Sequence, residues 1–381
     1  MIFRILEDQM AEKSRQSKAA DQRFMQLALS LGRRGQGRTW PNPAVGAVIA
    51  KDGLIVGRGW TQPGGRPHAE IEALRRAGPA ARSATLYVTL EPCTHYGKSP
   101  PCADAVIAAG IARVVSALED PNPEVAGAGH ARLRGAGITV DVGLGAEEAR
   151  RDHAGHIRRM RDGRPHVMLK LAASADGKAG AASRKPVAIT GERTRQRVHL
   201  LRARSDAIMI GIGTALSDDP ILTCRLSGMT EDSPVRVVLD SALRLPTNSR
   251  LVRNAREVPL WVVTAAEVPA APKKALEAAG VTVLSAPPLD GRLDLSAVLR
   301  LLAERGISRL MVEAGPILAA ALLEADLVDE VALFRSDKVV GPDGIDALEG
   351  MPLSALSRSP HLASVRSEAV GEDSCEIFER R

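Results

Sequence analysis

Two short stretches, PHAE at residues 67–70 and EPCTHYGKSPPC at residues 91–102, decide the expected fold and chemistry of the first half of this chain. They contain one imidazole, His68, two thiols, Cys93 and Cys102, and the carboxyl group of Glu70. One histidine and two cysteines can hold Zn²⁺ and leave its fourth position open, which is typical of catalytic zinc. A carboxylate beside that position, here Glu70, can carry protons for a bound water.

The residues around these stretches predict alternating strands and helices. An apolar run at 44–50, the turn residues 51–53 and a second run at 54–60 predict a β-hairpin. Periodicity and turn residues predict helices over 68–78, 102–110 and 130–137, and strands over 84–90, 112–118 and 138–143. This order, β-β-α-β-α-β-α-β, is that of a three-layer α/β domain. A helix over 21–31, with Asp21 as its candidate N-cap, precedes it.

The four chemical groups fall at the ends of these elements. His68 and Glu70 lie in the first turn of a predicted helix, Cys93 at the end of a strand, and Cys102 at the start of another helix. A helix N-terminus favours the thiolate that zinc requires. Any one of these residues alone is ordinary packing or surface, but the joint pattern predicts catalytic zinc. A structural zinc would need a fourth protein ligand, which His95 could supply, so that alternative stays open.

Length and composition predict a two-domain globular protein. At 381 residues the chain is too long for one ordinary core. Residues 1–20 are polar and mixed in charge, which predicts an N-terminal extension. The helical, charged segment 145–164 ends in Gly163-Arg164-Pro165, which predicts a boundary between a first domain at 21–163 and a second at 164–381.

Charge and cysteine content exclude several classes of protein. The net charge of +6 is spread among acidic residues without a Lys/Arg run, which argues against nucleic-acid binding. We find no export signal and no apolar run long enough for a membrane span. Four scattered cysteines are not a disulfide framework. The expectation is a cytoplasmic protein that binds neither membrane nor nucleic acid.

The second half of the chain predicts another α/β series. Strands are expected over 166–173, 206–213, 234–240, 259–265, 281–286, 308–314, 329–335 and 374–380, and helices over 192–204, 295–306 and 316–326. GIGTAL at 211–216 begins like a dinucleotide fingerprint but lacks the third glycine. A Rossmann domain is therefore not supported.

The zinc motif resembles that of the cytidine-deaminase superfamily, in which two residues usually separate the two cysteines. Here eight residues separate Cys93 from Cys102. This longer insert, THYGKSPP, and TWPNPAVGAVI at 39–49 resemble the deaminase half of the bifunctional riboflavin-biosynthesis deaminase–reductases, and the similarity extends over about residues 21–381. The resemblance implies an N-terminal three-layer cytidine-deaminase-like domain followed by a dihydrofolate-reductase-like α/β domain.

For the first domain the resemblance implies hydrolytic deamination of a diaminohydroxypyrimidine that carries a phosphoribosylamino group. One Zn²⁺ per chain would be bound by His68, Cys93 and Cys102, and Glu70 would be the catalytic proton carrier. The pyrimidine or its phosphate would be held by Asn42, His95 and Lys98.

For the second domain the matching stretches are 169–178, 189–225, 237–241 and 312–318. The resemblance implies reduction by NADPH, with hydride transfer to C1′ of the ribose, giving 5-amino-6-(5-phosphoribitylamino)uracil. The implied NADPH contacts are Ala172, Thr214, Asp218, Ser241 and Gly315. The implied contacts to the phosphorylated substrate are Arg202, Leu222, Arg225 and Glu313. A homo-oligomer, dimer or tetramer, is also expected.

Departures from the family pattern keep alternatives open. Pro186 and Ala188 stand where the family has Ser and Trp, which motivates a deaminase with an impaired reductase domain. His153 and His156 replace the usual Asn and Phe and could change how the domains dock. A nucleic-acid deaminase acting on a flipped base would need aromatic residues and a basic groove. A structural zinc module that binds a partner would need four protein ligands.

Overall fold

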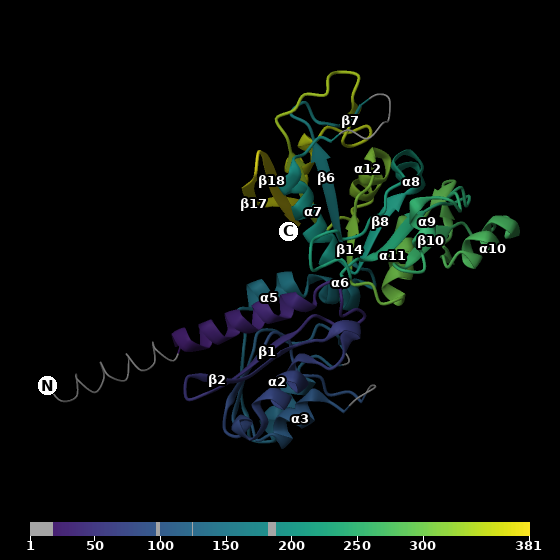
Figure 1. The fold of residues 1–381 in the computed structure, drawn as a ribbon. Coiled ribbons are helices and arrows are strands. Elements are labelled where there is room, and N and C mark those ends of the chain that lie inside the picture. Colours follow the sequence, from purple (N-terminus) through teal and green to yellow (C-terminus); the bar gives the residue numbers. More distant parts are fainter. Residues whose placement is uncertain (1–17, 97–99, 124, 182–187) are drawn as a thin grey trace. The chain divides into compact units, whose positions relative to one another are not determined.

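The computed structural model describes residues 18–96, 100–123, 125–181 and 188–381 (Figure 1). The chain divides into two compact units, of which the first ends at Asp162 and the second begins at Gly163. Within the described residues, no helix combines the length and apolar character that crossing a membrane requires.

The first unit is built on a hairpin of β1 (Gly46–Lys51) and β2 (Leu54–Trp60). Asp52 and Gly53 join the two strands with φ of 50° and 77°. Two consecutive left-handed residues are what a tight hairpin turn needs, and an Asp-Gly pair adopts them at low cost. The predicted hairpin is confirmed.

The five-stranded sheet has the order β2-β1-β3-β4-β5. Its other strands are β3 (Thr85–Val88), β4 (Arg113–Ser116) and β5 (Thr139–Val142), which run parallel to one another and are connected by α3 (Cys102–Ala108) and α4 (Ala128–Gly135). β1 pairs with β3 in antiparallel fashion, and α2 (Ala69–Ala77) connects β2 to β3. Short 3₁₀ turns lie at Arg33–Gly35, Pro63–Gly65 and Gly78–Ala81. The predicted order of elements is confirmed.

Two glycines show that helices cover both faces of this sheet. Gly59 pairs with Ala47 and shares its face, whereas Gly46 points to the opposite face. A Cβ atom on Gly59 would lie 2.4 Å from the carbonyl oxygen of Ala69 in α2. A Cβ atom on Gly46 would lie 1.8 Å from the carbonyl oxygen of Ala28 in the helix at 18–32. The absence of side chains lets both helices approach closely and produces the three layers.

The helix at 18–32 is longer than expected, and the interpretation of Asp21 as its N-cap is wrong. Residues 18–20 are already helical, because Lys-Ala-Ala is a strong helix-forming sequence. The Asp21 carboxylate instead accepts hydrogen bonds from the guanidinium of Arg113 and the hydroxyl of Tyr87. It therefore joins the helix to β3 and β4. The charged segment predicted to be helical forms α5 (Ala146–Asp152) and α6 (Ala154–Asp162).

The second unit contains a nine-stranded sheet of order β11-β10-β9-β8-β14-β6-β15-β18-β17. The strands are β6 (His166–Ala173), β8 (Ala207–Gly211), β9 (Val235–Leu239), β10 (Leu260–Thr264), β11 (Thr282–Ser285), β14 (Arg309–Val312), β15 (Glu330–Arg335), β17 (Leu362–Val370) and β18 (Asp373–Arg380). The helices are α7 (Glu192–Ala203), α8 (Ile212–Asp218), α9 (Arg250–Arg253), α10 (Ala270–Ala278), α11 (Leu295–Glu304), α12 (Pro316–Glu324) and α13 (Ser354–Arg358). β7 (Lys178–Gly180) pairs with β16 (Ile345–Asp346), and β12 (Pro288–Leu289) with β13 (Arg292–Leu293).

Strand direction decides where this sheet can hold a ligand. β6, β14, β8 and β9 are parallel neighbours, so their carboxyl ends meet at one edge. Ligands of open α/β sheets bind outside this edge. β17 and β18 are antiparallel additions at the other side of the sheet, and β17 was not expected from the sequence.

Candidate active sites

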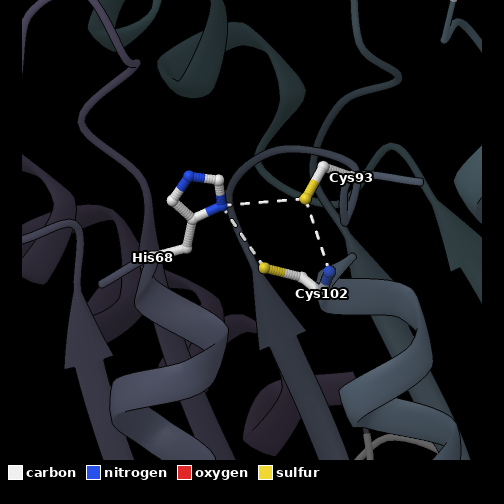
Figure 2. Close-up of side chains that lie close together, drawn as sticks. All are labelled: His68, Cys93 and Cys102. Atoms are coloured by element: carbon white, nitrogen blue, oxygen red, sulfur yellow. Dashed lines mark hydrogen bonds between the residues drawn. The ribbon is translucent and has the colours of Figure 1, made fainter. Parts of the chain in front are cut away.

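Three metal-ligand side chains converge in the first unit (Figure 2). The Nδ1 atom of His68, the residue that caps α2, lies 3.7 Å from the Sγ atom of Cys93 and 3.3 Å from that of Cys102. Cys102 is the first residue of α3. β3 ends at Val88, so Cys93 lies in the loop after the strand, and its expected place at the strand's end is wrong. The ligand atoms lie within 4.8 Å of one another, which allows one ion to contact all three.

The chemistry of this donor set fits Zn²⁺. The Cys102 thiol, His68 and the Cys102 backbone N–H all stabilise the Cys93 thiolate and lower the pKa of Cys93 to about 4. The hydrogen bond to Cys93, together with burial, raises the pKa of Cys102. One thiolate is thus already favoured without metal, and a bound zinc ion would displace the proton of the other thiol. Thiolates and imidazole are the ligands that zinc prefers in proteins.

The Glu70 carboxyl group lies beside these ligands. It stands in the first turn of α2, is 3% exposed and interacts with the Cys102 thiol. Burial raises the pKa of Glu70, although the neighbouring His68 opposes this effect. A carboxyl group with a raised pKa can take up and release a proton near neutral pH.

Of the three predicted pyrimidine contacts, the described part of the structure shows only Asn42 beside the donor set. The Asn42 amide nitrogen donates to the carbonyl oxygen of Gly65 at 2.8 Å and lies 3.4 Å from Nε2 of His68, so Asn42 stands beside the donor set. His95 is exposed and does not belong to the cluster of three ligand atoms. Lys98 lies outside the described residues.

Glu91 is a buried residue of this region whose importance the sequence did not reveal. Its carboxylate accepts four backbone N–H bonds, from Asp120 at 2.9 Å, Gly127 at 3.0 Å, Gly129 at 2.6 Å and His130 at 3.1 Å. Because Glu91 precedes Cys93 by two residues, it fixes the backbone at residue 120 and at residues 127–130 against the loop that carries Cys93. The sequence feature that could have identified Glu91 is its position in the motif Glu91-Pro92-Cys93.

The two unusual histidines make polar contacts within the first unit. Nε2 of His153 is buried 3.0 Å from the hydroxyl of Thr89, the residue after β3. Nε2 of His156 lies 3.3 Å from Oδ1 of Asp120. Both residues therefore help to fix the deaminase-like unit itself.

A buried ion pair marks the second candidate site. Arg202 of α7 donates to both carboxylate oxygens of Glu313, the residue after β14, at 2.6 and 2.9 Å. Its third nitrogen donates to the carbonyl oxygen of Thr223 at 3.1 Å. The two side chains are only 12% and 14% exposed. Burial would raise the pKa of Glu313, but the charges of Arg202 and Lys170 hold it below its usual value.

Lys170 is a charged residue of this site that the sequence analysis missed. It lies on β6, and burial lowers its pKa even though Glu313 stabilises its charged form. The stretch LKLAASADGK contains it, but there it looks like one polar position of a strand. Its neighbours, Glu313 and Arg202, are distant in sequence.

Arg225 and Leu222 lie on the loop next to this ion pair. Leu222 is buried, with a left-handed φ of 59°, and Arg225 is exposed. The Arg225 backbone N–H donates to Nδ1 of His199 on α7 at 3.3 Å. Although Arg225 is exposed as a residue, partial burial of its guanidinium and the charges of Arg202 and Arg250 lower the pKa of that group.

Four of the predicted NADPH contacts lie at or just after the carboxyl ends of parallel strands, and the fifth, Asp218, is the last residue of α8. Ala172 is on β6, Thr214 and Asp218 are on α8 after β8, Ser241 follows β9, and Gly315 caps α12 after β14. A Cβ atom on Gly315 would lie 3.1 Å from the Thr214 hydroxyl, so these two residues are neighbours.

The two positions at which this domain departs from the family pattern are Pro186 and Ala188. Pro186 lies outside the described residues, and the carbonyl oxygen of Ala188 accepts a hydrogen bond from Lys338.

Two family models match the two units. The cytidine and deoxycytidylate deaminase zinc-binding region matches residues 18–118, and the RibD C-terminal domain matches residues 165–375.

Relatives with both parts match nearly the whole chain. It is 44% identical over 368 residues to the riboflavin biosynthesis protein RibD of Escherichia coli K12, covering 93% of this chain and 98% of that one. It is 41% identical to RibD of Aquifex aeolicus over 94% and 98% of the two chains.

Solved structures agree with these sequence relatives. The structure of Acinetobacter baumannii RibD (form 1) matches with a TM-score of 0.85 and 35% identity, covering 95% of this chain and 99% of that one. A Thermotoga maritima diaminohydroxyphosphoribosylaminopyrimidine deaminase/5-amino-6-(5-phosphoribosylamino)uracil reductase matches with a TM-score of 0.82, 35% identity and the same coverage.

Proposed function

The chain belongs to the RibD family of riboflavin biosynthesis proteins, and we propose that it catalyses two consecutive steps of that pathway. The first is hydrolytic deamination of 2,5-diamino-6-(5-phosphoribosylamino)pyrimidin-4-one. The second is NADPH-dependent reduction of the product to 5-amino-6-(5-phosphoribitylamino)uracil. The observation that carries the proposal is one chain with a zinc donor set beside a buried carboxyl group in one unit and a buried cationic site in the other.

In the deaminase site His68, Cys93 and Cys102 would hold Zn²⁺, which when bound supplies a Lewis acid that activates water. Glu70 takes a proton from the attacking water and delivers it to the leaving ammonia. Its burial beside Cys102 and its raised pKa support this role. The contact of Asn42 with His68 supports its assignment to the pyrimidine, with His95 and Lys98 assigned by resemblance.

In the reductase site NADPH supplies the hydride, and the protein orients it toward C1′ of the ribose. We assign the cofactor to Ala172, Thr214, Asp218, Ser241 and Gly315. The free N–H groups at the start of α12 suit a cofactor phosphate. We assign the substrate to Leu222, Arg225 and the Arg202–Glu313 pair.

Arg225 is the residue best suited to the substrate phosphate. Each guanidinium nitrogen of Arg202 already donates to Glu313 or Thr223, whereas the exposed Arg225 makes no ion pair within the described part of the chain. Repulsion from Arg202 and Arg250 disfavours its charge, and a phosphate dianion would relieve that repulsion.

Nothing in the geometry of the described residues or in the comparisons favours the alternative of a deaminase without a working reductase.

A two-stage assay tests the proposal. Purified, zinc-replete protein is given the diaminopyrimidine substrate, and ammonia release is measured before NADPH is added. The expected result is stoichiometric ammonia followed by loss of the nicotinamide absorbance. A folded, zinc-containing protein that fails at both stages contradicts the proposal, and ammonia release without NADPH oxidation supports the deaminase-only alternative.

Three further assignments concern the domain bounds, the cellular location and the oligomeric state. We infer that residues 21–163 form the deaminase domain and 164–381 the reductase domain, after a polar extension at 1–20. The division between Asp162 and Gly163 supports this boundary. We also infer a cytoplasmic homo-oligomer, a dimer or a tetramer, which light scattering of the purified protein tests.

A further inference from the structure

Two side chains on α7 contact the same short loop. His199 and Arg202 are three residues apart and therefore share a face of the helix. Arg202 donates to the carbonyl oxygen of Thr223, and the N–H of Arg225 donates to Nδ1 of His199. The loop backbone from Thr223 to Arg225 is thus held at both ends, while the Arg225 side chain stays exposed.

A third contact and an unusual backbone conformation make this loop specific. The N–H of Cys224 donates to the Ser233 hydroxyl at 3.1 Å. Leu222 has a left-handed φ of 59°, which a leucine adopts only where surrounding contacts require it. Cys224 and Leu222 are buried, so Arg225 is the exposed end of an otherwise fixed segment.

The two α7 side chains differ in what their loss would do. Arg202 also holds Glu313, so its removal disturbs the buried ion pair as well as the loop. His199 contacts the loop through its backbone, since its ring accepts the Arg225 N–H bond and also interacts with the Thr223 backbone. Among the described residues, no hydrogen bond joins His199 to the Arg202–Glu313 pair. Burial and the charges of Arg202 and Arg225 lower the pKa of His199, although Glu313 and the Thr223 backbone oppose them. A neutral ring at pH 7 keeps Nδ1 able to accept the bond.

We propose that His199 is a positioning residue of the reductase, which holds Arg225 where it binds the substrate phosphate and so sets the preference for a phosphorylated substrate. The inference rests on the proposed function, because it needs a phosphorylated substrate at Arg225. His199 acts through the loop backbone and touches neither hydride donor nor acceptor. Its removal therefore weakens substrate binding and leaves the chemical step intact.

Three variants test this inference. His199→Leu removes the acceptor, and His199→Asn places an amide oxygen near the position of Nδ1. Gln196→Leu introduces the same leucine at an exposed position three residues earlier on α7. NADPH oxidation by the full-length enzyme is measured with the deaminated intermediate, 5-amino-6-(5-phosphoribosylamino)uracil, and with its dephosphorylated form.

In His199→Leu we expect the KM for the phosphorylated intermediate to rise about three- to tenfold, the range for one lost hydrogen bond, while kcat stays within about twofold. The kcat/KM for the dephosphorylated form should be unchanged. His199→Asn should recover most of the lost affinity, and Gln196→Leu should behave like the wild type. Thermal unfolding and ammonia release should be unchanged in all three variants.

Three results would overturn the inference: an unchanged KM in His199→Leu, no recovery in His199→Asn, or an equal loss with both forms of the substrate. If thermal unfolding shows that His199→Leu does not fold, His199→Asn and Gln196→Leu decide alone, and a raised KM in His199→Asn then counts against the proposal. A wild-type enzyme that does not oxidise NADPH with the intermediate contradicts the proposed function instead. The two failures are therefore distinguishable.

Discussion

The zinc donor set of the first unit and the charged site of the second unit are assembled in opposite ways. The first brings together His68, Cys93 and Cys102 from two short motifs, and their thiolates attract a cation. The second surrounds one carboxylate, Glu313, with Lys170 and Arg202, and leaves Arg225 exposed for an anion. The first site is incomplete without its metal, whereas the second is already held by an internal ion pair. Changes that remove one activity should therefore spare the other.

The largest effect is expected from Glu70→Ala. Deamination should fall about 10²- to 10⁴-fold, because Glu70 is the buried carboxyl group beside the donor set that we assign to proton transfer. Zinc content should stay at one ion per chain, since Glu70 is not among the three ligands, and reduction of supplied intermediate should be normal. Metal analysis and the two-stage assay measure this. Glu72→Gln, on the same helix, is the control and should retain deamination; loss of zinc in Glu70→Ala would contradict its assignment as a proton carrier.

The next effect tests the internal ion pair of the second site. Glu313→Gln leaves Arg202 and Lys170 buried without their counter-charge and should destabilise the second unit by about 3 kcal/mol. NADPH oxidation should be lost, while deamination persists. Glu368→Gln breaks the partly exposed pair of Glu368 with Arg197, whose side chains are 36% and 34% exposed, and should cost less than about 1 kcal/mol. Urea unfolding of both variants makes the comparison, and equal stabilities would refute the importance of burial.

Acid should act on the second unit through Asp329. This carboxylate is 1% exposed and accepts hydrogen bonds from Arg164, Arg380 and the Val167 N–H. Burial would raise the pKa of Asp329, but Arg164 and His166 hold it below the ordinary value of 3.8. A lowered pKa in the folded state stabilises the protein above pH 3.8, and this stabilisation is lost as the pH falls toward the folded pKa.

Asp329→Asn tests this acid dependence. The variant should be about 2 kcal/mol less stable at pH 7, because a charged acceptor becomes a neutral one. It should also lose less stability than the wild type between pH 5 and pH 3, a window chosen around the ordinary pKa of aspartate. Urea unfolding of both proteins at each pH gives both numbers. Parallel acid profiles for the two proteins would show that other carboxylates govern this range.

Local chemistry explains which parts of the fold could be predicted. The hairpin turn at Asp52-Gly53 and the convergence of His68, Cys93 and Cys102 could be predicted because neighbouring residues specify them. The role of Asp21 was missed because its partners, Tyr87 and Arg113, are 66 and 92 residues away. The cluster of Lys170 with Arg202 and Glu313 was missed for a similar reason, since Arg202 and Glu313 are 111 residues apart in the sequence.

Two elements that were not predicted, β17 and α10, lack the sequence patterns that are typical of a strand and a helix. β17 is an edge strand with four consecutive exposed residues, so it lacks the apolar alternation of a half-buried strand. Pairing with β18 is what makes it a strand. α10 contains Pro272, which usually argues against a helix, but the proline stands in the first turn, where no intrahelical N–H bond is needed.

The smallest effect concerns His153, one of the residues that departs from the family. Its hydrogen bond with Thr89 is buried, so Thr89→Val should destabilise the first unit by about 1 kcal/mol. His153→Asn, which restores the usual family residue, is shorter and should lose the same bond. Thr89→Val also removes the acceptor of the Gly46 N–H bond, so it should cost more than His153→Asn. The double variant should still cost less than the sum of the two, since both single changes remove the His153–Thr89 bond. Zinc affinity and ammonia release should be unchanged, because neither residue is a ligand; additive unfolding energies would mean that the two side chains act independently.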